Sequence, residues 1–439
     1  MEVDPLNSPL ILVTGATGYI ASRLSPRLLA AGYRVRCLAR EPLRLQGRTW
    51  SRDVEVVQGD VTVPATLGAA LEGVHSAYYL IHNMTHGHGY TSLELDSARV
   101  FASAAATAGV QHIIYLGGLA DPEGQIAPHM RSRIETGRVL REGSVPVTEF
   151  RAGVITGSGS ISFEMIRFMT ELFPIVPGPL WMRNKSQPIA MQNMIDYLIA
   201  ALTNPNGRGA FFEIGGPDIT TYGDLMLRYA RIRGLKRRML LVPGLPIWFM
   251  AFGVGLMTPV PYPIAYALIG GLSADSVVRH PEALAVFPEV RLINFDAAAR
   301  EALENTHPSH IERVWEDGRR KSKSIKHEGC FVEHREVQLD AEPARVMEVL
   351  QQVVRGSATF MEVKGTEGQL VVCVKHQPAG EKWIELRVRQ AAGVTYIAQT
   401  VFFCPRGLPG FLYWYLLYPF HLFASHRFLG RISSTAANR

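Results

Sequence analysis

The chain is poor in cysteine and slightly poor in charge. Its 439 residues include only 4 cysteines, which lie far apart, and 19% charged residues. The lack of any C-x-x-C pair excludes a cysteine-based zinc finger and a disulfide-rich scaffold, and is typical of a protein kept in a reducing compartment. The net charge of +6 is a modest basic excess, so the composition does not argue for a nucleic-acid partner.

We also expect no secretory leader. Residues 1–9 carry acids and prolines where a leader would have a basic and then an apolar segment. We therefore expect a protein that is made and kept in the cytoplasm. Peripheral contact with a membrane is a separate question, which depends on two uncharged stretches described below.

Strands and helices alternate in the first third of the chain. Helical stretches separate short apolar runs, which lie at 10–13, 33–38, 54–57, 77–81, 112–116 and 146–151. This alternation predicts an α/β fold with a doubly wound parallel Rossmann sheet. From about 155 to 300 the pattern loosens, and we expect these segments to form the substrate side of the same domain, 1–316.

A second domain is expected after a basic linker. The linker, 317–330, begins with the polar run DGRRKSKSIKH and shows no apolar periodicity. Beyond it, 331–439 predicts a small α+β domain with a strand, a helix, several antiparallel strands and an aromatic-rich terminal helix. This order is similar to that of START-like helix-grip domains, which enclose hydrophobic ligands.

The strongest motif follows the first strand, where residues 14–21 read TGATGYIA. The first glycine permits a tight turn, the second lets the backbone approach a pyrophosphate, and the next helix presents its N-terminal amides to the phosphates. An ordinary tight turn is the alternative, but the strand–loop–helix context favours a dinucleotide site. The predicted contacts in this loop are Gly15, Thr17, Gly18, Tyr19 and Ile20.

The end of the second strand indicates which dinucleotide is bound. NAD-binding proteins usually place an acid there to hold the ribose 2′-hydroxyl, whereas this strand ends with Arg40. A guanidinium can pair with a 2′-phosphate, so we expect NADP(H), with NAD(H) as the second choice. After the third strand, Asp60 and Val61 are predicted adenine contacts, although Asp60 could instead cap a turn.

Four segments carry a resemblance to a known family. They read TGATGYIA, LAREP, QGDV and YLGGL, and resemble the atypical short-chain dehydrogenases/reductases, in particular the NmrA-like proteins and the nucleotide-binding accessory subunit of complex I. The resemblance covers about residues 9–315 and implies NAD(P) binding, with residues 151–157 beside the nicotinamide. The rest is similar to a C-terminal domain of unknown function in bacterial members.

The catalytic pattern that the resemblance implies is not intact. The family uses Ser together with Tyr-x-x-x-Lys, but here the Ser position falls on Gly117 or Gly118, and the Tyr and Lys positions fall on His129 and Arg133. His129 could act as a substitute acid/base, with Arg133 holding the ribose. Alternatively the protein binds NADP(H) without hydride chemistry, as a sensor or scaffold, or the two residues belong to an ordinary surface helix.

The loop after the fourth strand should lie at the ligand-binding edge of the sheet. We expect the nicotinamide or the substrate near Ile81 and His82, with Tyr90 as a further candidate acid. The spacing H-x-x-x-H-x-H in this loop has no accompanying acid, so we expect no metal site.

Two long stretches contain no acidic or basic residue apart from histidine, namely 239–274 and 407–426. The first follows Lys236, Arg237 and Arg238 and is too interrupted by proline to span a bilayer. Both predict either apolar walls around a hydrophobic ligand or shallow membrane contact. Taken together, the sequence predicts an NADP(H)-dependent oxidoreductase acting on a hydrophobic or lipid-like small molecule; the alternative is the non-catalytic sensor or scaffold.

Overall fold

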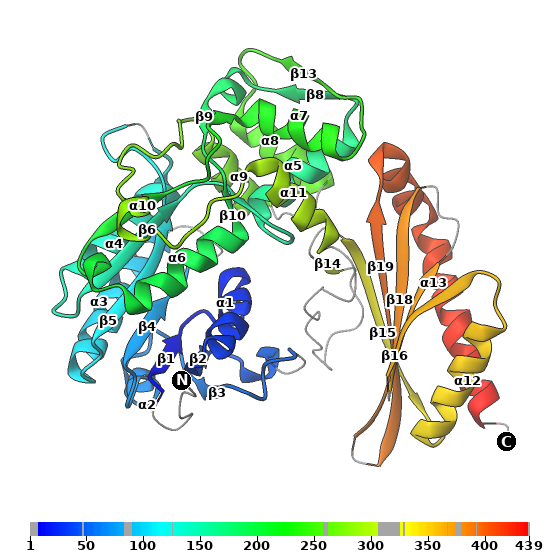
Figure 1. The fold of residues 1–439 in the computed structure, drawn as a ribbon. Coiled ribbons are helices and arrows are strands. Elements are labelled where there is room, and N and C mark those ends of the chain that lie inside the picture. Colours follow the sequence, from blue (N-terminus) through cyan, green and yellow to red (C-terminus); the bar gives the residue numbers. More distant parts are fainter. Residues whose placement is uncertain are drawn as a thin grey trace. The chain divides into compact units, whose positions relative to one another are not determined.

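The structure is a computed structural model in which the chain divides into two compact units (Figure 1). Unit 1 contains Met1–Arg167, Ile175–Glu304 and Glu312–Glu316; unit 2 contains Phe168–Pro174, Asn305–Ile311 and Asp317–Arg439. The described residues are 8–45, 48–82, 90–124, 126–257, 262–305, 325–327, 330–366, 368–374, 379–391 and 393–437.

Unit 1 is built on a seven-stranded sheet in the order β11-β6-β5-β4-β1-β2-β3. All neighbouring strands in it are parallel. The strands are β1 Leu10–Val13, β2 Arg34–Ala39, β3 Glu55–Gln58, β4 Ser76–Tyr79, β5 His112–Gly118, β6 Val147–Ala152 and β11 Phe211–Ile214. Because β1 lies between β2 and β4, the chain reverses its winding direction there, and the predicted doubly wound Rossmann sheet is confirmed.

Helices cover both faces of this sheet. They include α1 Tyr19–Ala30, α2 Leu67–Leu71, α3 Tyr90–Thr107, α4 Pro128–Arg141 and α6 Met191–Thr203. Buried residues of α1 and α6 pack with one face, and buried residues of α2, α3 and α4 pack with the other. Burial on both faces explains why the strands read as continuous apolar runs instead of alternating ones.

Shorter elements complete unit 1 on the substrate side. The strands are β7 Ile155–Thr156, β8 Ile175–Gly178, β9 Lys185–Ser186, β10 Ile189–Ala190, β12 Thr220–Thr221 and β13 Arg238–Leu241. The helices are α5 Ile161–Leu172, whose end belongs to unit 2, α7 Tyr222–Ile232, α8 Ile247–Met257, α9 Tyr262–Gly271, α10 Ala283–Val286 and α11 Phe295–Glu304. Single 3-10 turns lie at Pro42–Leu45, Pro64–Thr66, Leu180–Arg183 and Pro205–Gly207.

Unit 2 pairs a six-stranded antiparallel sheet with two helices, as the α+β prediction expected. The sheet has the order β14-β15-β19-β18-β17-β16, with β14 Ile325–His327, β15 Cys330–Leu339, β16 Phe360–Thr366, β17 Gln369–Val374, β18 Gly380–Ala391 and β19 Val394–Pro405. The helices are α12 Pro343–Arg355 and α13 Gly407–Ala437. Trp414 on α13 stacks on Phe331 and Phe403, with ring centroids 5.1 and 5.5 Å apart.

The predicted linker, 317–330, lies outside the described residues except for β14 and the first residue of β15. Cys37 and Cys373 are free thiols, but Cys404, at the end of β19, is disulfide-bonded. The sequence spacing did not predict this bridge.

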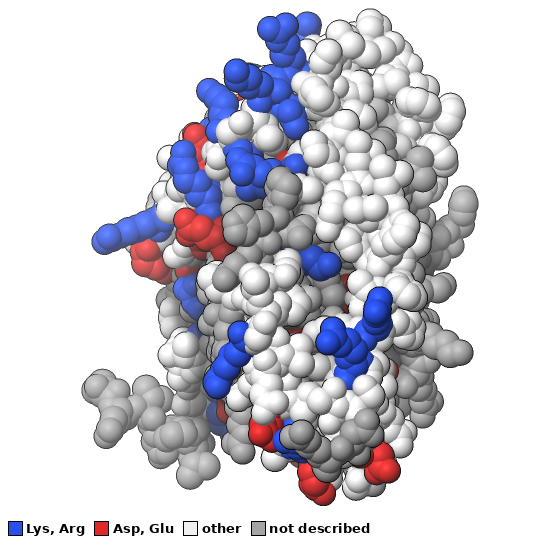
Figure 2. Space-filling view, turned by 90° about the vertical axis from the view of Figure 1, so that its right-hand side faces the viewer, with Lys and Arg blue, Asp and Glu red and all other residues white. Residues whose placement is uncertain are grey.

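Charged side chains are unevenly spread over the surface. Figure 2 shows a face on which a broad area without Lys, Arg, Asp or Glu lies beside a group of basic side chains.

No helix in the described part of the chain is long and apolar enough to cross a bilayer.

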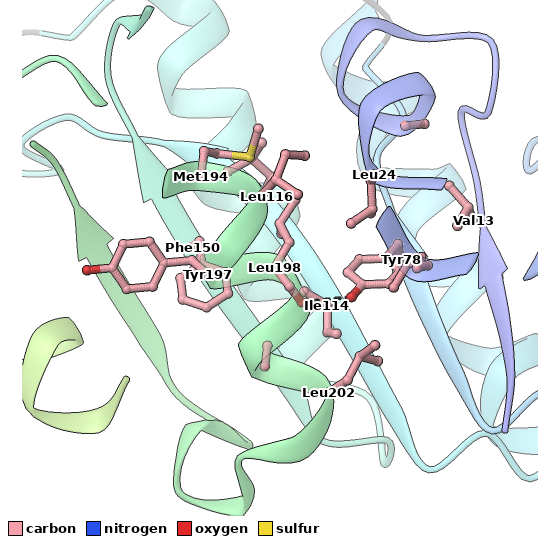
Figure 3. Close-up of a cluster of buried hydrophobic side chains, with 14 of the residues drawn as sticks. Val13, Leu24, Tyr78, Ile114, Leu116, Phe150, Met194, Tyr197, Leu198 and Leu202 are labelled. Carbon is pink, nitrogen blue, oxygen red and sulfur yellow. Dashed lines mark hydrogen bonds between the residues drawn. The ribbon is translucent and has the colours of Figure 1, made fainter. Parts of the chain in front are cut away.

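The core under the sheet supports the edge at which ligands bind in this fold. Val13, Leu24 and Tyr78 lie close to residues of β5, β6 and α6 (Figure 3). The Tyr78 hydroxyl donates to the Leu198 carbonyl of α6 at 2.7 Å. The ring of Tyr78 thus joins the centre of the sheet to the covering helix, which fixes the end of β4 in place.

Candidate functional site

The loop between β1 and α1 is held against the end of β4. The N–H and the Oγ1 hydroxyl of Thr14 donate to the Tyr78 carbonyl at 3.0 and 2.9 Å, and Oγ1 accepts from the Leu80 N–H at 3.1 Å. Gly15 then turns the chain with a φ of +64°. A Cβ at Gly15 would lie 2.8 Å from the Leu80 carbonyl oxygen, so this turn requires glycine.

The first turn of α1 forms a cradle that fits a phosphate group. The Gly18 N–H donates to the Gly15 carbonyl at 2.7 Å, no described side chain caps the helix, and its first turn carries no acid. A Cβ at Gly18 would lie 2.9 Å from the Gly15 carbonyl oxygen and would fill the cradle. Thr17 is exposed, and Tyr19 and Ile20 are half-buried. Helix N-termini with this geometry bind anions through their amides and partial positive charge.

Tyr19 connects this cradle to the segment that follows β7. The guanidinium carbon of Arg23 lies 4.0 Å from the centre of the Tyr19 ring, and Arg23 Nη2 donates to the Ser158 carbonyl at 2.8 Å. A Cβ at Gly157 would lie 2.8 Å from the Tyr19 hydroxyl oxygen. The end of 151–157, expected beside the nicotinamide, therefore lies next to the phosphate loop.

The three residues predicted to contact the adenosine part lie in different settings. Arg40 is exposed directly after β2, and its side chain pairs with no other described residue. Oδ1 of Asp60 accepts from the N–H and the hydroxyl of Thr62, both at 2.9 Å, and Val61 is buried. Asp60 therefore fixes the turn after β3, which is the structural alternative; its contact with an adenine stays a prediction.

At the carboxyl end of β4, His82 belongs to a buried hydrogen-bonded chain. His82 Nδ1 lies 2.6 Å from Oε1 of Glu94, and the Ser132 hydroxyl donates to Oε2 of Glu94 at 2.5 Å. Glu94 is 1% exposed. His82 Nε2 is buried and has no hydrogen-bond partner among the described residues. At the carboxyl edge of the sheet, where ligands bind in this fold, this unpaired nitrogen is available to a ligand.

The pKa shifts of Glu94 and His82 indicate the protonation states in this hydrogen-bonded group of side chains. Burial raises the pKa of Glu94, but the hydrogen bonds from His82 and Ser132, together with positive charge on His82 and Arg133, more than offset it, so the pKa is lowered overall. Burial also lowers the pKa of His82, against the hydrogen bond to Glu94, which raises it. At neutral pH a neutral imidazole donates its Nδ1–H to the Glu94 carboxylate, which leaves the lone pair on Nε2.

His129 and Arg133 lie on α4 close to His82. Burial, with Arg133 and His82 nearby, lowers the pKa of His129 to about 4. Arg133 Nη2 donates to the Leu116 carbonyl at 3.2 Å, near the end of β5. A Cβ at Gly271, the last residue of α9, would lie 3.2 Å from His129 Nε2, so α9 packs directly on this ring. The predicted pair is thus near His82, but α9 covers His129.

The structure also explains why the expected serine has no counterpart. A Cβ at Gly118 would lie 2.6 Å from Cε of Met130 and 3.4 Å from Cδ of Arg133. A Cβ at Gly117 would lie 3.2 Å from a carboxylate oxygen of Glu149. Side chains from α4 and β6 therefore fill the space, and a serine at either position would displace them.

Some candidate residues lie outside the described part of the chain, and two residues of the site were not predicted from the sequence. The two further histidines of the 82–90 loop and the side chain of Tyr90 lie outside the described residues. In the described part of the chain, no cluster of His, Cys, Asp or Glu could hold a metal. Glu94 and Ser132 were not singled out, because neither lies in a motif and only the packing of α3 against α4 brings them to His82.

Together these groups fit a dinucleotide along the carboxyl edge of the sheet. The anion cradle follows β1, a cation follows β2, and His82 and Arg133 lie at the ends of β4 and β5. In doubly wound folds ligands bind at this edge, where the winding reverses.

Comparison with known proteins agrees with this arrangement. A model of the "NmrA-like family" matches residues 7–177, and one described as "Protein of unknown function (DUF2867)" matches 327–426. The (4-alkanoyl-5-oxo-2,5-dihydrofuran-3-yl)methyl phosphate reductase of Streptomyces griseus is 31% identical over 278 residues, 59% of this chain and 85% of the relative. The chain belongs to the NmrA-like family of atypical short-chain dehydrogenases/reductases.

Other proteins similar to this chain carry different names. The photosystem II assembly factor Ycf39 of Cyanophora paradoxa is 24% identical over 239 residues, 53% of this chain and 71% of the relative. Among solved structures, triphenylmethane reductase of Citrobacter sp., complexed with NADP(H), matches with a TM-score of 0.55 and 20% identity, over 66% of this chain and 99% of that one. This last likeness shows the shared fold of unit 1.

Proposed function

We propose that this NmrA-like protein is an NADP(H)-dependent reductase of a hydrophobic small molecule, with His82 as the group that exchanges a proton with the substrate. The observation that carries the proposal is the Ser132–Glu94–His82 chain, which ends in a buried Nε2 without a partner among the described residues. His129, the sequence-based candidate, becomes the second choice.

The preference for NADP(H) is supported by Arg40 and by the relatives. Arg40 follows β2, where an acid would favour NAD(H), and its guanidinium pairs with no other described residue. The Citrobacter reductase, which shares the fold, is a complex with NADP(H). The amides of the first turn of α1 would hold the pyrophosphate, and Arg133 would face the nicotinamide ribose.

A hydrophobic substrate is supported by the wall of the site. Helix α9 contains no charged residue, and its end packs on His129 of α4. Apolar walls with a few polar groups are typical of pockets for small apolar ligands. The Streptomyces griseus relative reduces a compound that carries an alkanoyl chain, as its name states.

In the proposed reaction, residues of this protein hold and transfer one proton. When held by these residues, NADPH would supply the hydride that reduces the substrate. The protonated minority form of His82 carries on Nε2 the proton that the reduced oxygen or carbon takes up, and Glu94 stabilises this imidazolium and keeps the ring oriented. Ser132 holds the second oxygen of Glu94, so the carboxylate cannot turn away from Nδ1. Arg133 adds positive charge near the reacting end, which favours electron density developing on a substrate oxygen.

A non-catalytic sensor or scaffold is the alternative. It is favoured by Gly118, since the space for the family's serine is filled by Met130. The Cyanophora paradoxa relative, an assembly factor by name, shows that the family includes proteins named for another role.

NADPH oxidation separates the two functions. With alkanoyl-substituted carbonyl compounds and quinones as substrates, the reductase should consume NADPH. His82→Asn keeps a donor for Glu94 but removes Nε2, so kcat should fall about a hundredfold or more while NADPH affinity is unchanged. His129→Asn is the matched control, with a smaller loss expected. Tight NADPH binding without oxidation across these substrates would instead establish the sensor.

A further inference from the structure

Helices α8 and α9 form an uncharged hairpin whose outer side is aromatic. Trp248, Phe249 and Phe252 on α8 are 58%, 53% and 57% exposed, and Tyr262 and Tyr266 on α9 are 44% and 48% exposed. No acidic or basic residue, including histidine, occurs anywhere in 239–274. Large aromatic side chains are seldom gathered on a surface that faces only water, so this patch indicates an interaction.

The sequence of α8 explains why burial against unit 1 cannot hide these rings. The helix reads IWFMAFGVGLM and is apolar on every side. Ala251 and Val254 face the protein and are buried, which leaves the larger side chains outward. The aromatic rings of α8 therefore lie on its exposed side, the reverse of a helix whose outer face suits water.

Two exposed basic residues stand at the start of the uncharged stretch in the sequence. Lys236 and Arg238 are exposed and precede the uncharged stretch directly. Arg238 begins β13 and lies beside Ile175 of β8. Ile175 and Leu240 of this two-stranded ribbon are themselves 57% and 55% exposed. Apolar side chains and a cation are therefore neighbours in this ribbon.

We propose that the α8–α9 hairpin docks unit 1 on an anionic lipid bilayer. The aromatic side chains enter the interfacial layer, where Trp and Tyr are favoured, and Lys236 and Arg238 contact lipid phosphates. A second copy of the chain fits less well: cations come directly before the uncharged stretch, but 239–274 contains no acid to pair with them in a self-complementary interface.

The proposal does not depend on the reductase activity, because binding to lipid is measured without turnover. It also gives the hairpin two roles. Its outer side meets the bilayer, and the end of α9 packs on His129 of the candidate site. Delivery of a membrane-borne substrate along this wall rests on the proposed function, whereas docking itself does not.

Co-sedimentation with vesicles tests the docking. The full-length protein should bind vesicles of phosphatidylglycerol and phosphatidylcholine, and bind vesicles of phosphatidylcholine alone much more weakly. The double variant Trp248→Ser/Phe252→Ser should reduce binding at least about tenfold, since each ring loses its apolar burial. Lys236→Ala/Arg238→Ala should also reduce it about tenfold and remove most of its sensitivity to salt.

The chain offers a matched control in unit 2. Leu416 and Phe420 on α13 are 70% and 69% exposed, so Leu416→Ser/Phe420→Ser removes apolar side chains that are more exposed than Trp248 and Phe252 and lie outside the hairpin. Vesicle binding unchanged by the hairpin variants, or lost only with the α13 variant, would overturn the proposal. A dimer that disappears in Trp248→Ser/Phe252→Ser, with no vesicle binding by the parent, would assign the surface to a second copy instead. Thermal unfolding verifies that each variant is folded.

Discussion

Replacing Glu94 by Gln tests whether the buried carboxylate controls His82. The side chains have nearly the same shape, so packing around α3 is preserved. The amide oxygen can still accept from His82 Nδ1, and the amide N–H can donate to Ser132, whose hydroxyl can rotate to accept. What is lost is the negative charge that lies 2.6 Å from the ring nitrogen.

The size of the effect follows from that one contact. The hydrogen bond from an imidazolium to a carboxylate is stronger than one to a neutral amide by about 1 kcal/mol. Since 1.36 kcal/mol corresponds to one pKa unit, the pKa of His82, already lowered by burial, should fall by a further ~0.7 units. Above its pKa, the protonated fraction should then fall about fivefold.

Two measurements check this expectation. An NMR titration of the imidazole reports the pKa without substrate or cofactor. The pH dependence of kcat/KM for NADPH-driven reduction should move to lower pH, because the reduction needs the protonated ring. Ser132→Ala is the control, with a smaller shift in the same direction. A pKa that stays in place or rises in Glu94→Gln would refute the role assigned to Glu94.

Three further predictions follow from the site. Gly15→Ala should lower the free energy of unfolding by about 1–2 kcal/mol and abolish nucleotide binding, because its Cβ would lie 2.8 Å from the Leu80 carbonyl; thermal unfolding and NADPH fluorescence measure the two effects, and normal binding would be inconsistent with the cradle. Arg40→Asp should move the preference from NADPH towards NADH, and an unchanged ratio of dissociation constants would exclude pairing with the 2′-phosphate. In the folded protein the pKa of His129 is about 4, whereas in the unfolded chain it is about 6.5. Below about pH 6.5 the unfolded chain therefore binds more protons than the folded one. Between about pH 7 and about pH 5, His129 should lower the free energy of unfolding by about 2 kcal/mol. Urea unfolding of His129→Gln should show a smaller loss, and equal losses in both proteins would disprove it.

The phosphate loop could be predicted from sequence because its physics is local. An apolar strand, two glycines and a helix start lie within a few residues, and each constrains the next. Gly15 needs its positive φ whatever surrounds it. The spacing of His129 and Arg133 was equally informative, since four residues on a helix place both side chains on one face.

The hydrogen bonds that join Ser132, Glu94 and His82 could not be predicted from local sequence patterns. Glu94 lies on α3 and looks like an ordinary helical acid, with His82 12 residues before it and Ser132 38 residues after it. Only the packing of α3 beside α4 brings the three side chains together, and sequence patterns do not encode such packing. The sequence also could not show why Gly118 stands where the family has serine. Only the structure shows that the Met130 side chain occupies the space that a serine side chain would need.

Titration of the purified protein with NADPH tests the central claim most directly, because both proposed functions need the cradle between β1 and α1. We expect saturable binding of one NADPH per chain, with NADH bound more weakly. Failure to bind either nucleotide by a folded protein would contradict the account of this site.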